Sequence, residues 1–400
     1  MKYAFIVPDG LGDWPFQGLG NKTPLEVAKI PHLNGLSQKS ILGTLKTVPD
    51  GMYPGSDVCG LSLLGYDPSQ SYSGRAPLEA ANLGLILKEG EMAYRTNLVT
   101  VEGDILADYS AGHVSTEEAV LLINAVEEKL GSDKITFYPG KMYRHIMIDR
   151  RGKRGKIEMD PPHDYMGEPY GKHWPRGEGA DFFIDLMKRS RDFLENHPVN
   201  QKRAAEGKRK ANMIWLWGGG TSPKIVPFEE KFKVQGGVIS AVDLVNGIGR
   251  YIGLEIINVP GATGYFDTDY KAKGQYASKA LDRLDLIYVH IEATDEAGHV
   301  GDAKEKVKAI EEIDRHIVGP VLTRLKKENE WRMCVVPDHY TPLEKKTHVA
   351  DPVPFIFAGS DVREASSLSY TEKNASQTGI KIEKGYELMS KLIRGWKSSA

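Results

Sequence analysis

Residues 333–339 place the strongest constraint on how this chain can fold. The run from Met333 to Pro337 is apolar and typical of a buried β-strand, and it ends abruptly in Asp338 and His339. In an open α/β sheet, ligands bind in the crevice beyond the carboxyl ends of the strands. A carboxylate beside an imidazole at that position offers a divalent metal one oxygen and one nitrogen ligand. The same pair also suits a turn with a capped helix behind it, so this stretch alone leaves both interpretations open.

Two other predicted strands end in acidic residues. Residues 3–7 form a continuous apolar run that leads to Asp9, and residues 286–291 form another that leads to Asp295 and His299. Continuous apolar runs are typical of strands buried on both faces of a parallel sheet. The aspartate and the histidine four positions later share one face if their turn is helical. The alternative is a solvated loop acid followed by an unrelated histidine.

If these three strands are neighbours, carboxylates and imidazoles meet at one edge of the sheet. The side chains concerned are Asp9, Asp295, Asp338, His299, His339 and His348. Carboxylates held this close strongly disfavour joint ionisation, so the group requires cations between them. Two divalent metals satisfy the set, and a two-metal site suits in-line displacement at phosphorus. His348 by itself fits a metal ligand and a packed histidine equally well.

Ser56 is the candidate nucleophile. It follows Pro54-Gly55 and is predicted to be the first residue of a helix. An isolated serine in such a place is most often an N-cap. A helix N-terminus also presents free N–H groups that suit a phosphate, and metal coordination lowers the pKa of a serine hydroxyl. The residues therefore predict metal-assisted phosphoryl transfer through a phosphoserine.

Length and element pattern predict two domains, because 400 residues exceed the size at which a single core usually stops growing. Residues 1–85 and 226–400 alternate strands and helices, which predicts an α/β core with a doubly wound, mainly parallel sheet. Residues 86–225 have an irregular α+β pattern, which predicts a smaller inserted domain. Within the core, helices are predicted over residues 238–252 and 304–327.

Neither glycine-rich stretch predicts a nucleotide site. Gly10 and Gly12 follow the first strand, but the dinucleotide pattern requires glycine where Pro15 stands. Residues 218–221 read Gly-Gly-Gly-Thr without the lysine of a P-loop, so a glycine-rich turn is predicted there. No nucleotide cofactor is therefore expected.

The composition excludes several classes of partner. The 52 basic and 54 acidic residues give a net charge of −2, which supplies no electrostatic case for nucleic acid or an anionic membrane. No apolar run is long enough for a transmembrane helix, and the N-terminal run is too short for a signal peptide. Only Cys59 and Cys334 occur, without CxxC spacing, so a disulfide framework is not expected and a reducing cytoplasm fits. The oligomeric state is left open.

Several short motifs, taken in order, identify a family resemblance. They are PDGLGD, TPLE, PGSD before LSLLGYDP, SAGHVSTEEA, ATGYFDT, DEAGH, PDHYTP and DPVPF. Together they resemble the alkaline phosphatase superfamily, and more closely the cofactor-independent phosphoglycerate mutases of the archaeal type. The resemblance implies a sheet of alkaline phosphatase type, a small phosphorylated hydroxy acid as substrate, and interconversion of 3-phosphoglycerate and 2-phosphoglycerate. It also implies that the insert is a substrate-binding lid that shields the phosphoserine from water.

The resemblance implies which residues hold each of two metal ions. The ligands of one ion would be Asp295, His299 and His348. The ligands of the other would be Asp9, Asp338, His339 and the nucleophile Ser56. Mn²⁺ is the expected ion, with Co²⁺, Zn²⁺ and Mg²⁺ as alternatives, because availability separates them as much as ligand type.

Substrate contacts and substrate identity are less constrained. Arg95, His113, Arg144 and Lys273 are candidate contacts, since each is a cation or imidazole near a motif in or beside the insert. Each fits a solvated surface charge equally well. The motifs PGSDV, PPHD and WLWG also resemble a bacterial subgroup proposed to be homoserine kinases. A phosphomonoesterase is a further alternative, expected if the lid fails to exclude water.

Overall fold

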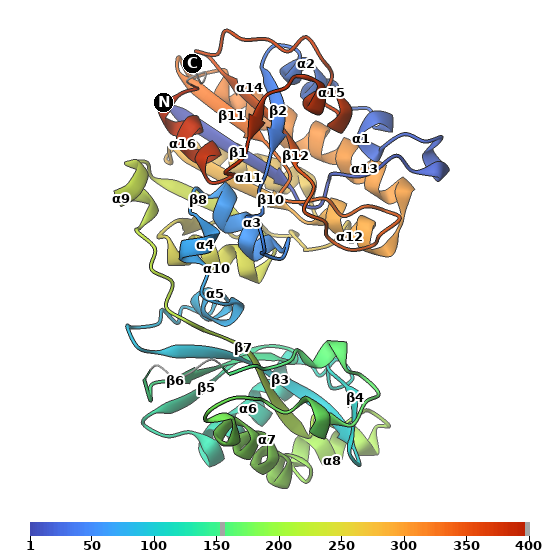
Figure 1. Ribbon diagram of the computed structural model, residues 1–400, viewed down its shortest axis with the longest axis vertical. Helices are drawn as coiled ribbons and strands as arrows, with labels where there is room; N and C mark the ends of the chain where they lie inside the picture. Colours follow the sequence, from blue (N-terminus) through green and yellow to red (C-terminus); the bar gives the residue numbers. More distant parts are fainter. Residues whose placement is uncertain (153–156, 397–400) are drawn as a thin grey trace. The chain divides into compact units, whose positions relative to one another are not determined.

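The computed structural model describes residues 1–152 and 157–396 and divides into two compact units (Figure 1). The first unit comprises Met1–Tyr72 and Lys224–Ala400, and the second comprises Ser73–Pro223.

The second unit begins at Ser73 rather than at residue 86. Helix α5 (Arg75–Asn82) accounts for the difference, because it packs on the sheet of the second unit. Ala76 and Ala80 of this helix are buried against Ala93 and Ile146 of that sheet. The apolar contacts of α5 therefore extend the insert toward the N-terminus.

The first unit is built on a mixed, mainly parallel sheet of eight strands among the described residues. In order across the sheet these are β13 (Lys381–Ile382), β2 (Ile41–Leu45), β12 (Val353–Gly359), β11 (Trp331–Val335), β1 (Lys2–Pro8), β10 (Leu286–Ile291), β8 (Gly236–Ile239) and β9 (Glu255–Ile256). Strand β1 is parallel to both β10 and β11, and β8 and β9 continue the parallel part. Strand β12 is antiparallel to β11 and to β2. The predicted α/β class with a mainly parallel sheet is confirmed.

Helices cover both faces of this sheet, as the alternation of buried residues requires. Ala4 and Ile6 of β1 belong to a large apolar core on one face, whereas Phe5 points to the other face and stacks on Tyr288 with ring centroids 5.5 Å apart. The helices that pack on the first face are α2 (Pro31–Ser37), α11 (Tyr270–Ala280), α13 (Ala303–Ile313), α14 (Gly319–Leu325) and α15 (Glu372–Gln377). Those on the other are α3 (Ser56–Leu63), α10 (Asp243–Tyr251) and α16 (Glu387–Arg394).

Of the two helices predicted from the periodicity, the first is shorter in the structure, and the second is helical over 303–325 but irregular within. Val238 and Ile239 belong to β8, since they are buried and pair with β10, and α10 begins only at Asp243. The predicted helix over 304–327 is interrupted by a π-helical turn, η4 (Asp314–Val318). Pro320 follows that turn and has no amide hydrogen to donate to it, which disfavours a regular α-helix there.

The second unit is an antiparallel sheet with helices on its faces. Its strands are β3 (Met92–Glu102), β4 (Ile105–Asp108), β5 (Ile135–Lys141), β6 (Arg144–Asp149) and β7 (Met213–Thr221). Helices α6 (Thr116–Leu130), α7 (Ala180–Leu194) and α8 (Pro198–Ala205) complete the unit. The turn predicted at residues 218–221 is wrong: these residues extend β7, because Gly220 and Thr221 pair with β3.

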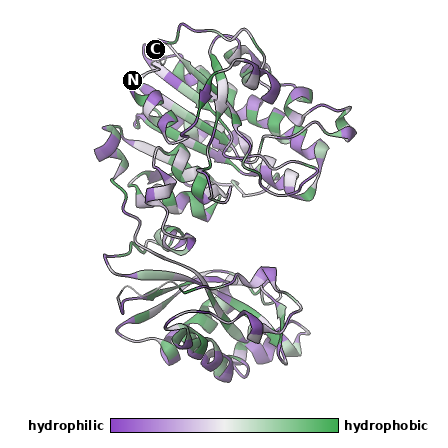
Figure 2. Ribbon diagram, in the orientation of Figure 1, coloured by the Kyte–Doolittle hydropathy of each residue, from purple (hydrophilic) through white to green (hydrophobic). Residues whose placement is uncertain are grey.

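Hydropathy follows the packing in both units. Helices such as α7 and α13 alternate hydrophobic and hydrophilic residues, as expected when one face is buried (Figure 2). Within the described ranges, no helix combines the length and the apolar character needed to cross a membrane.

Candidate active site

The carboxyl ends of three adjacent parallel strands carry the acidic residues singled out in the sequence. Asp9 directly follows β1, and Asp338 lies in the loop after β11. Asp295 lies in the first turn of α12 (Ala293–Val300), which begins just after β10. Because β1 is flanked by β10 and β11, the three carboxylates lie together at the carboxyl ends of these parallel strands.

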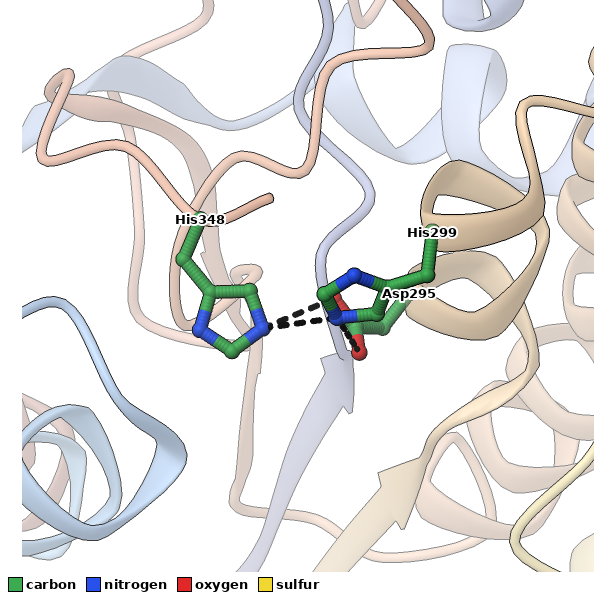
Figure 3. A group of neighbouring side chains, drawn as sticks. All are labelled: Asp295, His299 and His348. Atoms are coloured by element: carbon green, nitrogen blue, oxygen red, sulfur yellow. Dashed lines mark hydrogen bonds and ion pairs between the residues drawn. The ribbon is translucent and has the colours of Figure 1, made fainter. Parts of the chain in front are cut away.

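The first triad consists of Asp295, His299 and His348 (Figure 3). His299 Nε2 lies 3.1 Å from Asp295 Oδ2, and His348 Nε2 lies 3.4 Å from Asp295 Oδ1. The two imidazole Nε2 atoms face each other at 3.0 Å, so all three side chains point to one position. Hydrogen bonding to Asp295 raises the pKa of His299 to about 9. Burial would raise the pKa of Asp295, but hydrogen bonds from His299 and His348 hold it well below its usual range.

The second triad consists of Asp9, Asp338 and His339 and is completely enclosed. His339 Nε2 lies 3.3 Å from Asp9 Oδ1 and 3.4 Å from Asp338 Oδ2. Asp338 Oδ1 accepts hydrogen bonds from the amides of Gly10 and His339, which orients its other oxygen toward the triad. The rings of His339 and His348 stack with centroids 3.9 Å apart, so the two triads are immediate neighbours.

The acceptor atoms of the second triad fit a cation. Both carboxylate oxygens of Asp9, Oδ2 of Asp338 and Nε2 of His339 are buried without a hydrogen-bond partner in the described structure. Burial, and then the negative charge of Asp338, raises the pKa of Asp9 well above its usual range. Buried acceptors without donors are costly, and a divalent metal ion would satisfy all of them. The residues of both triads therefore fit divalent metal binding.

His290 and Glu292 also adjoin the site, and the sequence did not indicate them. His290 Nε2 lies 3.2 Å from Asp9 Oδ2, whereas His339 approaches the other oxygen, Oδ1. Its Nδ1 lies 3.3 Å from the hydroxyl of Ser240 and 3.7 Å from Glu292 Oε2. Burial lowers the pKa of His290 to about 4 and raises that of Glu292 to about 8. In the sequence, the one feature that could have indicated His290 is that it is a histidine inside an otherwise apolar strand.

Ser56 is the first residue of α3, as predicted, and the N-cap is Gly55. The alternative that Ser56 caps the helix is therefore wrong. One residue before Ser56 and one after it lie near the triads. The ring of Tyr53 lies 6.2 Å from that of His348, and Cys59 has a pKa raised first by burial and then by the negative charge of Asp338.

A cluster of cations and aromatic rings lies in the second unit and contains two of the candidate substrate contacts. Arg95 of β3 stacks on Trp217, with its guanidinium carbon 3.9 Å from the ring centroid, and donates to Glu79 at 2.9 Å. Burial lowers the pKa of Arg95, and the nearby charges of Arg75 and Arg144 lower it further. Arg75 also pairs with Glu79, at 3.3 Å, so two guanidinium groups share this carboxylate, and that of Arg144 lies near enough to act on the pKa of Arg95. Such an excess of buried and partly exposed positive charge favours an anion.

The other two candidate contacts occupy different places. His113 is exposed in the loop before α6 and has a positive φ of 50°, and its amide donates to the Ser110 hydroxyl at 3.3 Å. Lys273 lies on α11 of the first unit, where it is completely buried and its Nζ has no hydrogen-bond partner. Burial lowers the pKa of Lys273 to about 8, against the opposing charge of Glu292.

Glu372 is a partly buried acid outside the triads, and it predicts a pH-dependent stability. Burial raises its pKa from 4.5 to about 7. The unfolded chain releases this proton near pH 4.5 and the folded protein near pH 7, so the stabilisation is present at low pH and is lost as the pH rises through this interval. Between about pH 5 and about pH 8 the free energy of unfolding should fall by roughly 2–3 kcal/mol more in the metal-free wild type than in Glu372→Gln. Urea denaturation at each pH measures this difference, and parallel pH profiles for the two proteins would contradict it.

Comparison with known proteins agrees with this geometry. The family described as 2,3-bisphosphoglycerate-independent phosphoglycerate mutase matches residues 37–200, and the family described as type I phosphodiesterase / nucleotide pyrophosphatase matches residues 170–366. A probable 2,3-bisphosphoglycerate-independent phosphoglycerate mutase of Geobacter sulfurreducens is 46% identical over 398 residues, which cover 98% of this chain and 100% of the relative. The corresponding mutase of Methanosarcina barkeri is 45% identical over 396 residues, with 98% and 100% covered.

A solved structure from Pyrococcus horikoshii has the same overall fold. It superposes with a TM-score of 0.83 at 31% identity, covering 100% of this chain and 99% of the other. The mutases of Geobacter sulfurreducens and Methanosarcina barkeri are 46% and 45% identical to this chain over 98% of its length, and this similarity establishes the family. The chain belongs to the 2,3-bisphosphoglycerate-independent phosphoglycerate mutases, of the archaeal type.

Proposed function

We propose that this protein interconverts 3-phosphoglycerate and 2-phosphoglycerate through a phosphoserine at Ser56. The Ser56 oxygen forms a bond to phosphorus while the bond between phosphorus and the C3 oxygen of the substrate breaks. The proton lost by Ser56 balances the proton gained by the departing hydroxyl. Glycerate stays bound and reorients, and its C2 hydroxyl then takes the phosphoryl group from Ser56. No nucleotide or second phosphate donor enters this scheme.

Each triad is proposed to hold one divalent metal ion, with Mn²⁺ the expected ion and Co²⁺, Zn²⁺ or Mg²⁺ the alternatives. The first ion would be bound by Asp295, His299 and His348. The second would be bound by Asp9, Asp338, His339 and Ser56. Bound metal lowers the pKa of the serine hydroxyl and stabilises the charge on the attacking and leaving oxygens.

One observation carries this proposal. Two adjacent triads of possible metal ligands lie at the carboxyl ends of the parallel strands, and residues close to Ser56 in the chain lie near them. The rings of His339 and His348 are in contact between the triads, and Tyr53 next to the serine segment lies near His348. The two-metal arrangement is suited to in-line transfer at phosphorus. The buried oxygens of Asp9 accept no hydrogen bond from the described residues, which leaves them free to bind the second ion.

The second unit is proposed to supply the anion-binding residues for the substrate. The guanidinium groups of Arg95 and Arg144 are the best candidates, since a phosphorylated hydroxy acid carries both a phosphate and a carboxylate. Arg75 belongs to the same cluster through Glu79, which lies 3.3 Å from it. His113 and Lys273 remain candidate substrate contacts, but neither belongs to this cluster of guanidinium groups. Two buried free thiols, Cys59 and Cys334, support a reducing cytoplasm as the location.

Arg144→Ala is predicted to raise the KM for 3-phosphoglycerate by about tenfold, because a hydrogen bond to a charged group contributes roughly 1.5–3 kcal/mol. Its side chain is exposed, so the free energy of unfolding should change by less than about 0.5 kcal/mol. Arg189→Ala is the matched control, since Arg189 lies on α7 of the same unit and pairs only with Asp185 at 3.2 Å in the described structure. Steady-state kinetics decide: an unchanged KM, or an equal rise in both variants, would remove Arg144 from the substrate contacts.

The proposed reaction is tested by supplying pure full-length protein with 3-phosphoglycerate and Mn²⁺ or Co²⁺ and measuring 2-phosphoglycerate. Turnover that chelation stops and added metal restores is the expected result. A second reaction mixture with homoserine and ATP, and a third that measures free phosphate, cover the two alternatives. Product in the second mixture with none in the first would replace the mutase by a kinase, and steady phosphate release alone would indicate a phosphomonoesterase.

A further inference from the structure

Lys306 of α13 is a fully buried cation that the proposed reaction does not use. Its side chain has 0% exposure. The Nζ atom lies 2.8 Å from Asp13 Oδ2, 2.8 Å from the carbonyl oxygen of Thr341 and 3.4 Å from that of Gly12. An ammonium group has three protons to donate, so these acceptors account for all of them. A lysine buried this completely has a specific structural task rather than a solvated surface role.

The acceptors of Lys306 belong to the two loops that carry the second triad. Gly12 and Asp13 lie in the loop that begins with Asp9, and Thr341 lies in the loop that contains Asp338. One side chain on a separate helix therefore binds both loops at once. Neither loop contributes to a helix or strand at these positions, so its conformation depends on such contacts.

The two loops also contact each other directly. Gly10 N donates to Asp338 Oδ1 at 3.1 Å, and Thr341 N donates to the Gly12 carbonyl at 3.3 Å. A Cβ atom on Gly12 would lie 2.1 Å from the ring of Tyr340, so no side chain fits between the loops here. A change in loop spacing would therefore move the oxygens of Asp9 and Asp338 relative to each other.

Asp13 is itself held on all sides, which makes its pair with Lys306 rigid. Its Oδ1 accepts from the amides of Trp14 at 2.8 Å and Leu343 at 3.2 Å. Its own amide donates to Glu372 Oε1 at 3.2 Å. The Lys306–Asp13 pair thus connects α13 and the loop after Asp9 to the loop after Asp338 by several hydrogen bonds.

We propose that Lys306 is a positioning residue that sets the spacing of these two loops and so the metal affinity of the second triad. This inference rests on the proposed two-metal site. Lys306 touches none of the ligand side chains and acts through the backbone of Gly12 and Thr341 and the carboxylate of Asp13. The first triad is linked to Lys306 through Thr341, whose hydroxyl donates to Asp295. Asp295 and His299 also lie together on α12 and are held by the hydrogen bonds of that helix, whereas Asp9 and Asp338 stand on the two loops themselves. Loss of Lys306 should therefore weaken binding of the second ion more than that of the first.

The test is a Co²⁺ titration of metal-free, full-length protein, followed by visible absorption and calorimetry. A His348→Ala background leaves only the second triad complete, and a His339→Ala background leaves only the first. Lys306→Met should weaken Co²⁺ binding by roughly tenfold or more in the first background and by less than about twofold in the second. Lys308→Met is the matched control, since Lys308 lies on the same helix, pairs with Glu305 at 2.9 Å and is 64% exposed.

A second variant guards against loss of folding. Lys306→Met leaves Asp13 buried without its cation, whereas Lys306→Met combined with Asp13→Asn removes both charges and should retain the fold. The double variant is expected to show the same selective loss, and raising the Mn²⁺ concentration should restore its kcat. Equal weakening of both triads, or no weakening of the second, would overturn the positioning role. A wild type that binds fewer than two ions would instead overturn the proposed function.

Discussion

Ser56→Ala is expected to abolish mutase activity, lowering kcat by at least about 10⁴-fold, while the protein stays folded and still binds metal. Loss of a nucleophile removes the covalent route entirely, and comparable losses are seen when the nucleophile of a serine enzyme is removed. No hydrogen bond of the Ser56 side chain supports the fold in the described structure, and Gly55 is the N-cap of α3. The free energy of unfolding should therefore change by less than about 0.5 kcal/mol.

Ser62→Ala is the matched control for this variant. Ser62 lies on the same helix, is buried and has a hydroxyl without a hydrogen-bond partner, so its replacement should leave kcat unchanged. Rapid quenching of wild type with labelled 3-phosphoglycerate should leave label on the protein, and Ser56→Ala should carry none. If Ser56→Ala retained appreciable activity, the phosphoryl group would have to pass by another route.

Asp9→Asn is expected to lower activity by at least about 10³-fold and, at the same time, to make the metal-free protein more stable. Asp9 is fully buried, and burial together with the negative charge of Asp338 raises its pKa well above the usual range. In the absence of metal, the amide removes this unfavourable charge and should stabilise the fold by on the order of 1–2 kcal/mol. With metal present the order should reverse, because only the wild type gains stability from binding the second ion.

Asp13→Asn provides the contrast, since Asp13 lies in the same loop but is paired with Lys306 at 2.8 Å. Removing one partner of a buried ion pair leaves the other unpaired, so this variant should lose about 3 kcal/mol with or without metal. Thermal unfolding of the wild type, Asp9→Asn and Asp13→Asn, each with and without Mn²⁺, compares the stability of each variant with that of the wild type under both conditions. If Asp9→Asn destabilised the metal-free protein as Asp13→Asn does, the charge repulsion assigned to the second triad would be absent.

The acidic residues at the carboxyl ends of the parallel strands could be predicted from the sequence, because the patterns that indicate them are local. Apolar runs ending in Asp9, Asp295 and Asp338 identify both the strands and the end at which the acids lie. Their convergence required only that the strands be neighbours, and β1 does pair with both β10 and β11. The helical spacing of Asp295 and His299 could also be predicted, and α12 contains both.

The remaining site residues depend on contacts that no local pattern records. His290 resembles an ordinary core residue of an apolar strand, and only the pairing of Val7 with His290 places it beside Asp9. Lys306 stands in a charged, amphipathic helix where a solvated lysine is the normal expectation, yet it is completely buried and donates to the loops after Asp9 and Asp338. Tertiary packing, rather than composition or periodicity, decides the role of both residues.

Local periodicity misplaced the start of one helix of the first unit and missed an irregular turn within another. Val238 and Ile239 fit a helix by spacing, but pairing with β10 makes them a strand. The long helix predicted over 304–327 ignored Pro320, which follows the π-helical turn η4. Both cases show a neighbouring strand or a missing amide hydrogen overriding hydrophobic spacing.

Anomalous diffraction from crystals of the protein soaked in Mn²⁺ tests the central claim most directly. Two peaks are expected, one within coordination distance of Asp295, His299 and His348, and the other within coordination distance of Asp9, Asp338, His339 and the Ser56 oxygen. A single peak, or a second peak remote from Ser56, would contradict a two-metal phosphoserine site in this protein.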